Sequence, residues 1–171
     1  MSFRGPLALI LVLGMLPVAC ATGSAGPNGS SQPDPGPTVM EAPTLIILYV
    51  ADQARARAFY ATVLEVEPTL DVPGMTEFPL PGGARLGLMP EAGIKTLLGE
   101  ALPDPAGAAG VPRAELYLRV EDPAALHARA LSAGARELSG LEARPWGDEV
   151  AYSLDPDAHV LALARALATT R

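Results

Sequence analysis

The side chains that could do chemistry are few, and three of them share one alternating segment. Within residues 114–120, Glu115, Tyr117 and Arg119 occupy every second position. A β-strand places alternate side chains on one face, so these three would present an acid, a phenol and a guanidinium together. Tyr49 lies in an earlier segment of the same pattern. Aromatic and apolar groups with a few charges are typical of a pocket for a flat or amphipathic small molecule.

Each of these residues has a functional and a structural interpretation. Glu115, the only candidate catalytic residue, could orient a ligand or accept a proton, or it could pair with Arg85 or Arg113. Arg119 could bind a ligand carboxylate or phosphate through two hydrogen bonds, or satisfy a neighbour at a sheet edge. The tyrosines could stack on a ligand ring or fill space in the fold.

Trp146, the single tryptophan, falls in a loop over residues 144–148. Its indole could form a stacking wall over a cleft or pack against a sheet. The Pro- and Gly-containing segment 90–113 could lie across the cleft as a lid or act as a plain linker. The candidate ligand-binding residues are therefore Tyr49, Glu115, Tyr117, Arg119 and Trp146.

Composition excludes several classes of function. The 171 residues carry a net charge of −7 with a single lysine, so no basic patch is available for nucleic acid. One cysteine excludes an internal disulfide framework. Of the two histidines, we expect His127 on the solvent face of a helix and His159 as a polar hairpin residue, neither as a metal ligand. The sequence lacks a phosphate-binding loop and a nucleophile-elbow motif.

The amino terminus indicates export. Arg4 precedes an apolar run at residues 7–16, and small residues follow, which predicts a signal peptide over residues 1–20. The run LPVAC resembles a bacterial lipoprotein box, which implies lipid on Cys20 as the only membrane contact and a location in the cell envelope. The alternative is ordinary cleavage after residue 21, which releases a soluble periplasmic or secreted protein. Residues 21–43 are rich in Gly, Ser and Pro and predict a disordered linker.

Residues 44–171 carry the fold, and they contain one pattern twice. Asp52 and Asp122 are predicted helix N-caps, 70 residues apart, and each follows a strand ending in valine. The predicted helices cover 54–64, with Ala58, Phe59, Val63 and Leu64 inward, and 123–133. Strands are predicted at 44–50, 68–72, 76–80, 85–89, 114–120, 136–141, 149–154 and 160–165.

This order predicts an α+β fold of tandem βαβββ modules, 44–89 and 114–165, joined by a connector over 90–113. Each module has a sheet with one face covered by its own helix. The remaining faces of two curved four-stranded sheets would then form a cleft.

Two motifs at this spacing resemble the vicinal oxygen chelate superfamily of glyoxalase I, extradiol dioxygenases and the fosfomycin and bleomycin resistance proteins. They are LYVADQARARAFYATVL, starting at Leu48, and AYSLDPDAHVLALA, starting at Ala151. The resemblance implies a glyoxalase/bleomycin resistance-like fold, a homodimer, and, in the enzymes of the superfamily, a metal between the modules.

Carried over from the family, the metal-ligand positions are Leu45, Gly87, Glu115 and Ala162. Only Glu115 among them has a side chain that can coordinate a metal, whereas catalytic sites need about three protein ligands. We therefore expect no metal and no cofactor.

These observations predict metal-independent binding of a small molecule by an exported domain. Two alternatives remain. One is a glyoxalase- or dioxygenase-like lyase or isomerase with Glu115 as base and an unforeseen metal site. The other is sequestration of a drug or toxin by a dimer.

Overall fold

The computed structural model describes residues 43–168. The predicted signal peptide, Cys20 and nearly all of the linker lie outside these residues. No helix in this part of the chain is long and apolar enough to span a membrane.

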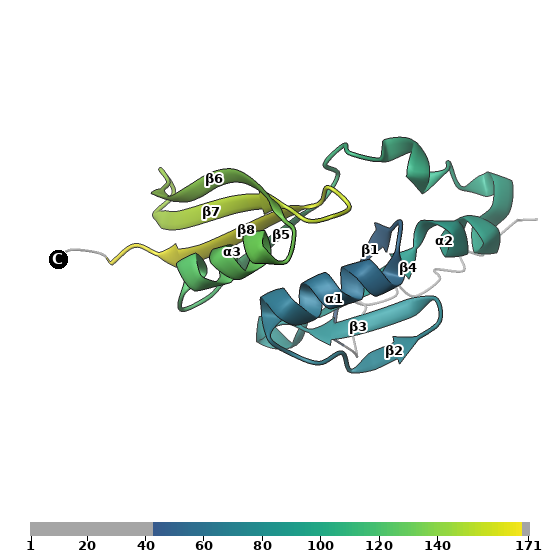
Figure 1. The fold of residues 1–171 in the computed structure, drawn as a ribbon, viewed down its shortest axis with the longest axis horizontal. Helices are drawn as coiled ribbons and strands as arrows, with labels where there is room; N and C mark the ends of the chain where they lie inside the picture. Colours follow the sequence, from purple (N-terminus) through teal and green to yellow (C-terminus); the bar gives the residue numbers. More distant parts are fainter. Residues whose placement is uncertain (1–42, 169–171) are drawn as a thin grey trace, which may run out of the picture. The chain divides into compact units, whose positions relative to one another are not determined.

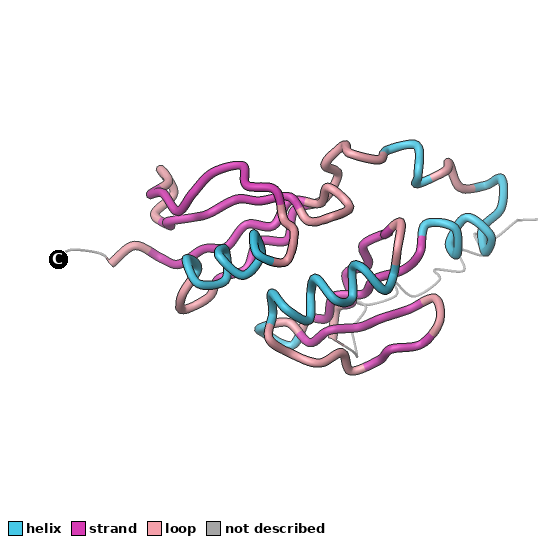
Figure 2. The backbone as a smooth tube through the Cα atoms, viewed as in Figure 1, coloured by secondary structure: helices cyan, strands magenta, loops and turns pink. Residues whose placement is uncertain are grey.

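The first module is a four-stranded sheet with one helix (Figures 1 and 2). Its sheet order is β1-β4-β3-β2, with β1 parallel to β4 and the other pairs antiparallel. The elements are β1 (Leu45–Val50), α1 (Gln53–Leu64), β2 (Leu70–Val72), β3 (Met75–Pro79) and β4 (Arg85–Pro90), with the short 3-10 helix η1 (Pro81–Gly83) before β4.

The second module repeats this topology in the order β5-β8-β7-β6. Its elements are β5 (Glu115–Arg119), α3 (Pro123–Ser132), β6 (Arg136–Ala143), β7 (Asp148–Leu154) and β8 (Val160–Ala166). Between the modules lie α2 (Glu91–Leu98), η2 (Gly99–Ala101) and η3 (Pro105–Ala108). The predicted α+β fold of two βαβββ modules is confirmed.

Individual residues of the two modules correspond to each other, but the sequence separation between corresponding residues takes two values. Positions in β1 and α1 match β5 and α3 at an offset of 70, as Asp52 and Asp122 show by capping their helices with bonds of 3.0 Å. In β3 and β4 the offset is 75, since the pair Glu77–Gly87 corresponds to Tyr152–Ala162. The second module therefore contains five more residues between its helix and β7.

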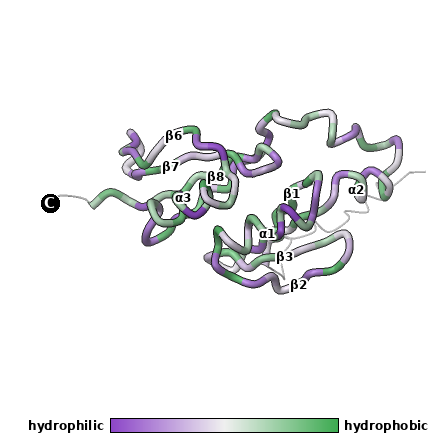
Figure 3. Tube along the Cα trace, in the orientation of Figure 1, coloured by the Kyte–Doolittle hydropathy of each residue, from purple (hydrophilic) through white to green (hydrophobic). Residues whose placement is uncertain are grey.

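The helices cover one face of each sheet and also contact each other. Leu48, Phe59 and Leu86 of the first module join Leu118 and Leu161 of the second in one hydrophobic core. β8 is hydrophobic along most of its length (Figure 3), as expected for a strand buried in the middle of a sheet.

Two sequence expectations about helix faces were wrong. On α1, Ala58 is exposed, whereas Ala56 and Tyr60 are buried beside Phe59 and Val63. On α3, His127 is 6% exposed rather than on the solvent face. It lies one turn from Ala130, which is fully buried, so the packing of α3 sets its position rather than the polarity of its ring.

A buried polar network joins the two modules. Asp155, in the β7–β8 turn, accepts a hydrogen bond of 2.8 Å from the Tyr60 hydroxyl of α1 and lies 3.0 Å from Nδ1 of His159. In the same turn, Asp157 accepts hydrogen bonds from the backbone N–H of Ala51 and from the Arg55 guanidinium, at 3.0 and 2.7 Å. We call Tyr60, Asp155, Asp157 and His159 the closed joint.

The pKa values in this network reflect its burial. Burial alone raises the pKa of Asp155, but the hydrogen bond and charge of His159 and the Tyr60 hydroxyl outweigh it, so the pKa of Asp155 lies below its ordinary value. Burial, together with the neighbouring Asp155 carboxylate, raises the pKa of the Tyr60 hydroxyl well above its ordinary value. Tyr60 therefore remains a donor to an ionised Asp155.

Substituting Tyr60→Phe should lower the free energy of unfolding at pH 7 by about 1.5–3 kcal/mol, because it leaves a buried carboxylate without one donor. Since the native pKa of Asp155 is lowered, its contribution is complete above the unfolded pKa of about 4 and disappears as the pH falls through the native value. Urea unfolding of both proteins at pH 7 and pH 3 measures this, and the difference should shrink at pH 3. Tyr49→Phe is the control, a half-buried tyrosine on β1 that is not part of the closed joint. An equal loss in both variants would contradict the assignment.

Candidate functional site

Four side chains meet on the face of the second sheet that α3 does not cover. The Tyr117 hydroxyl donates to Asp148 Oδ2 at 2.6 Å and accepts from Trp146 Nε1 at 3.2 Å. Arg119 Nη2 donates to the same carboxylate oxygen at 3.0 Å, and its guanidinium lies 5.7 Å from the centre of the Tyr117 ring. We call Tyr117, Arg119, Trp146 and Asp148 the aromatic cluster.

The strands explain why these residues meet. Tyr117 is paired with Ala162 of β8, which in turn is paired with Tyr152 of β7. The alanines at 162 and 164 and Val150 are fully buried, and the two tyrosines pack against them. Small residues in the centre of the sheet therefore leave room for tyrosine rings to lie across it.

Arg144 adds a second guanidinium beside the aromatic cluster. It lies 5.2 Å from the centre of the Tyr152 ring and donates to Ser139 Oγ at 2.6 Å. Cations over aromatic faces are attracted by the ring quadrupole, so each tyrosine of this face has an arginine partner.

The cluster holds one ionised acid beside one neutral phenol. The Tyr117 hydroxyl, followed by Arg119, lowers the pKa of Asp148 below its ordinary value. Burial and the Asp148 carboxylate raise the pKa of Tyr117, which the Trp146 N–H partly offsets. At neutral pH Tyr117 therefore donates to a carboxylate, while Arg119, whose side chain is 70% exposed, donates to the same carboxylate through Nη2.

Of the five predicted ligand-binding residues, the structure brings together three. Tyr117, Arg119 and Trp146 belong to the aromatic cluster, and Trp146 is 57% exposed rather than packed into the sheet. Tyr49 and Glu115 lie outside it, half-buried on β1 and exposed on β5 respectively. Arg85, one expected partner of Glu115, pairs instead with Glu77, and no ion pair of Glu115 occurs in the described part of the chain.

A pocket of about 420 Å³ adjoins the cluster, in the size range of small-molecule sites. The first module forms one wall, and β5 forms the other with Tyr117 and Arg119. The first-module residues that line it are Ile46, Leu80, Pro81, Gly82 and Ala84. The pocket thus combines apolar walls with one exposed guanidinium.

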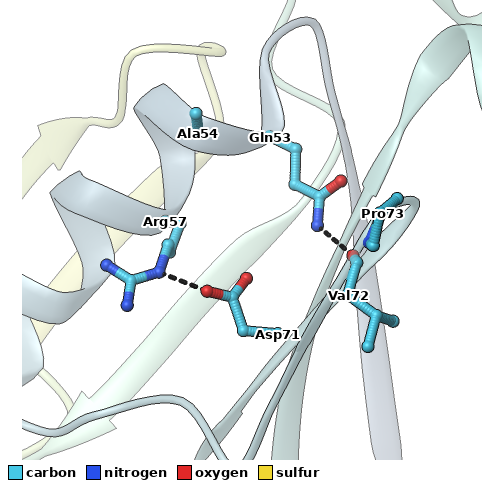
Figure 4. Close-up of a pocket in the computed structure, with 6 residues that line it drawn as sticks. All are labelled: Gln53, Ala54, Arg57, Asp71, Val72 and Pro73. Carbon is cyan, nitrogen blue, oxygen red and sulfur yellow. Dashed lines mark hydrogen bonds and ion pairs between the residues drawn. The ribbon is translucent and has the colours of Figure 1, made fainter.

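A second pocket, of about 360 Å³, lies between α1 and the β2–β3 hairpin (Figure 4). Its polar groups are already paired, with Arg57 Nε 2.7 Å from Asp71 and Gln53 Nε2 donating to the carbonyl of Val72 at 2.8 Å. These contacts tie the hairpin to the helix and indicate a structural role.

The positions that hold a metal in the family do not fit one here. Ala162 is fully buried beside Tyr117, and a side chain at Gly87 would meet Ile47 Cγ1 at 3.1 Å and Leu45 Cδ1 at 3.3 Å. Apolar groups therefore occupy the space that ligands would need. Among residues 43–168, no group of three or more His, Cys, Asp or Glu side chains is arranged to hold a metal ion.

Asp148, Tyr152 and Arg144 were not among the predicted site residues. Asp148 and Arg144 flank Trp146 in the sequence, and Tyr152 shares its strand face with Asp148 by simple alternation. These signals were present, but the contact of Asp148 with Tyr117 depends on the pairing of β7 and β5 through β8.

Comparison with known families identifies the chain. Residues 45–164 match the model of the glyoxalase-like domain family, so the protein belongs to this family and to the vicinal oxygen chelate superfamily. No curated protein matches the sequence.

Solved structures share the fold at low sequence identity. A glyoxalase-related enzyme from Fulvimarina pelagi is 22% identical, with a TM-score of 0.62, over 74% of this chain and 88% of that one. A glyoxalase/bleomycin resistance protein/dioxygenase from Nocardioides is 19% identical, with a TM-score of 0.62, over 80% and 90%. A protein from Agrobacterium tumefaciens, solved by NMR, is 27% identical, with a TM-score of 0.57, over 74% and 98%.

Substituting Tyr117→Phe should release Trp146 and raise the pKa of Asp148, because the hydroxyl holds the indole and is the main cause of the low Asp148 pKa. Acrylamide quenching of the single tryptophan should increase, and NMR titration of the Asp148 carboxyl should report the pKa change. Tyr152→Phe is the control on the same face. Unchanged quenching in Tyr117→Phe would show that the hydroxyl does not position Trp146.

Proposed function

We propose that the domain binds a small molecule, without a metal, in the pocket between Tyr117 and Arg119 of β5 and the facing wall of the first module. The observation that carries the proposal is the aromatic cluster, in which Asp148 fixes a tyrosine, an arginine and, through the tyrosine, a tryptophan beside an apolar pocket. Preorganised polar groups at the mouth of an apolar pocket give a ligand its orientation.

The electrostatics favour ligands with a planar or apolar body and an acceptor group. The exposed guanidinium of Arg119 uses one N–H on Asp148, so an edge remains for a ligand oxygen. Trp146 does not line the pocket, but its exposed indole donates to the hydroxyl of Tyr117, which does. Metal independence is supported by Leu45, Gly87 and Ala162, whose side chains supply no ligand atoms.

We also propose that the protein is exported and anchored through lipid on Cys20, and that it forms a homodimer. The apolar run at residues 7–16 and the cysteine directly after Ala19 support the first statement. The family resemblance supports the second.

Ligand binding should change the fluorescence of Trp146, the only tryptophan in the protein, because its indole donates to the hydroxyl of Tyr117, which lines the pocket. In a panel of aromatic acids, glutathione conjugates and glycopeptide antibiotics, we expect at least one class to give a saturable change in tryptophan fluorescence. The affinity should be the same in the presence of EDTA and in the presence of added Zn²⁺. Arg119→Gln should weaken that binding about tenfold. The control is Arg165→Gln, an arginine outside the pocket that pairs with Glu149. No response across the panel, or a response that requires metal, would contradict the proposal.

Substituting Cys20→Ser should abolish lipidation, because the lipid is carried on the cysteine sulfur. The wild-type protein should partition into detergent and should gain mass from acyl chains, whereas the variant should remain in the aqueous phase. Mass spectrometry of both purified proteins measures this. A wild-type protein cleaved after residue 21 and free of lipid would establish ordinary secretion instead.

A further inference from the structure

The two ends of the interface between the modules differ, although their backbones are related by the repeat. At one end the β7–β8 turn meets α1 in the closed joint. At the other end, the β3–β4 turn and the C-terminus of α1 meet α3 and the end of β5. The offsets of 70 and 75 match each residue of the closed joint to a smaller or apolar one. Tyr60, Asp155, Asp157 and His159 correspond to Ala130, Leu80, Gly82 and Ala84.

Beside Leu80 at this end lies a pocket of about 390 Å³, which we call the open joint. Gly82 and Ala84 line the neighbouring pocket beside Tyr117 instead. Its walls are apolar and come from both modules. They include Leu64, Val66 and Leu80 of the first module and Leu118, Val120 and Leu126 of the second. Apolar walls that face a void lose dispersion contacts, which an apolar molecule of matching size would restore.

The polar groups of the open joint are Arg129 and Glu65 at its edge. Arg129 lies in the last turn of α3, with its side chain 27% exposed, and pairs with Glu65, which is 68% exposed. An ion pair with so exposed an acid contributes little. Glu65 also holds a left-handed backbone conformation, with φ of 54°, at the C-terminus of α1, a conformation that favours glycine.

The comparison of the two joints indicates what would bind. In the closed joint the turn supplies two carboxylates, Asp155 and Asp157, to donors on the first module. In the open joint the turn supplies no carboxylate, and the donors Tyr60 and Arg55 have the counterparts Ala130 and Ala125. Arg129 is the cation in its lining and its partner Glu65 is exposed, so an anionic group on an apolar ligand complements this pocket.

We propose that the open joint binds a small carboxylic acid with an apolar body. The carboxylate replaces Glu65 on Arg129, and the apolar body lies between Leu80, Leu118 and Leu126. None of the aromatic-cluster residues lines this site, although it shares Leu80, Pro81 and Leu118 with the pocket beside Tyr117.

Octanoate and decanoate are suitable probes, with octanamide and octylamine as the neutral and cationic comparisons. We expect one saturable site for the acids by calorimetry and at least about tenfold weaker binding of the amide and the amine. The single tryptophan should not respond, because neither Trp146 nor Tyr117, which accepts a hydrogen bond from its indole, lines the open joint. Failure of both acids to bind would overturn the proposal, but it would leave the proposed function intact, since that depends on the Trp146 signal.

Three variants test the location. Leu126→Trp should fill the pocket and abolish acid binding, and Arg129→Gln should remove the preference for acid over amide. Arg57→Gln is the matched control, an ion-paired arginine on the other helix, outside the open joint (Figure 4). Equal acid binding in Arg129→Gln and Arg57→Gln would overturn the assignment of the carboxylate. If Leu126→Trp fails to fold, the comparison of Arg129→Gln with Arg57→Gln still tests whether the carboxylate binds at Arg129.

Discussion

The structure depends on one buried carboxylate. Asp155 lies in a hairpin of the second module, yet its main side-chain donor from outside the turn is Tyr60, on the helix of the first. A buried charge is tolerated only when its acceptor positions are filled, and Asp155 also accepts from the backbone N–H groups of Asp157 and His159. The turn, helix α1 and the relation between the modules are thus fixed together. The pocket beside Tyr117 has one wall from each module, so its shape depends on the relation that this joint and the shared core maintain.

The order of elements could be predicted from sequence because two short-range signals suffice for it. Alternation defines the strands, and an acid before each helix defines its start, as Asp52 and Asp122 do. The buried faces of the helices were harder to predict. Tyr60 and His127 carry polar atoms and occupy interior positions, and only the contact between α1 and α3 explains why. Sequence patterns describe an element's own surface, whereas burial of these residues depends on the element packed against it.

The candidate site could be predicted in part. Tyr117 and Arg119 share a face by alternation, and this follows from local geometry. Their connection to Trp146 and Asp148 crosses β8 and the β6–β7 loop, so it required the strand order. Tyr49 corresponds to Arg119 in the repeat, but it lies on the sheet of the first module and is therefore outside the cluster. The repeat therefore predicted the order of helices and strands better than it predicted which side chains form the candidate site.

The change of offset from 70 to 75 means that the two modules differ in the length of one hairpin. In the first module β2 and β3 are joined by the two residues Pro73 and Gly74, whereas β6 and β7 are longer and joined by residues 144–147. Five added residues account for the difference, and they bring in both Trp146 and Arg144. The longer hairpin therefore carries the indole that bonds Tyr117 and the guanidinium that lies over Tyr152, two contacts that the turn Pro73-Gly74 of the first module does not supply.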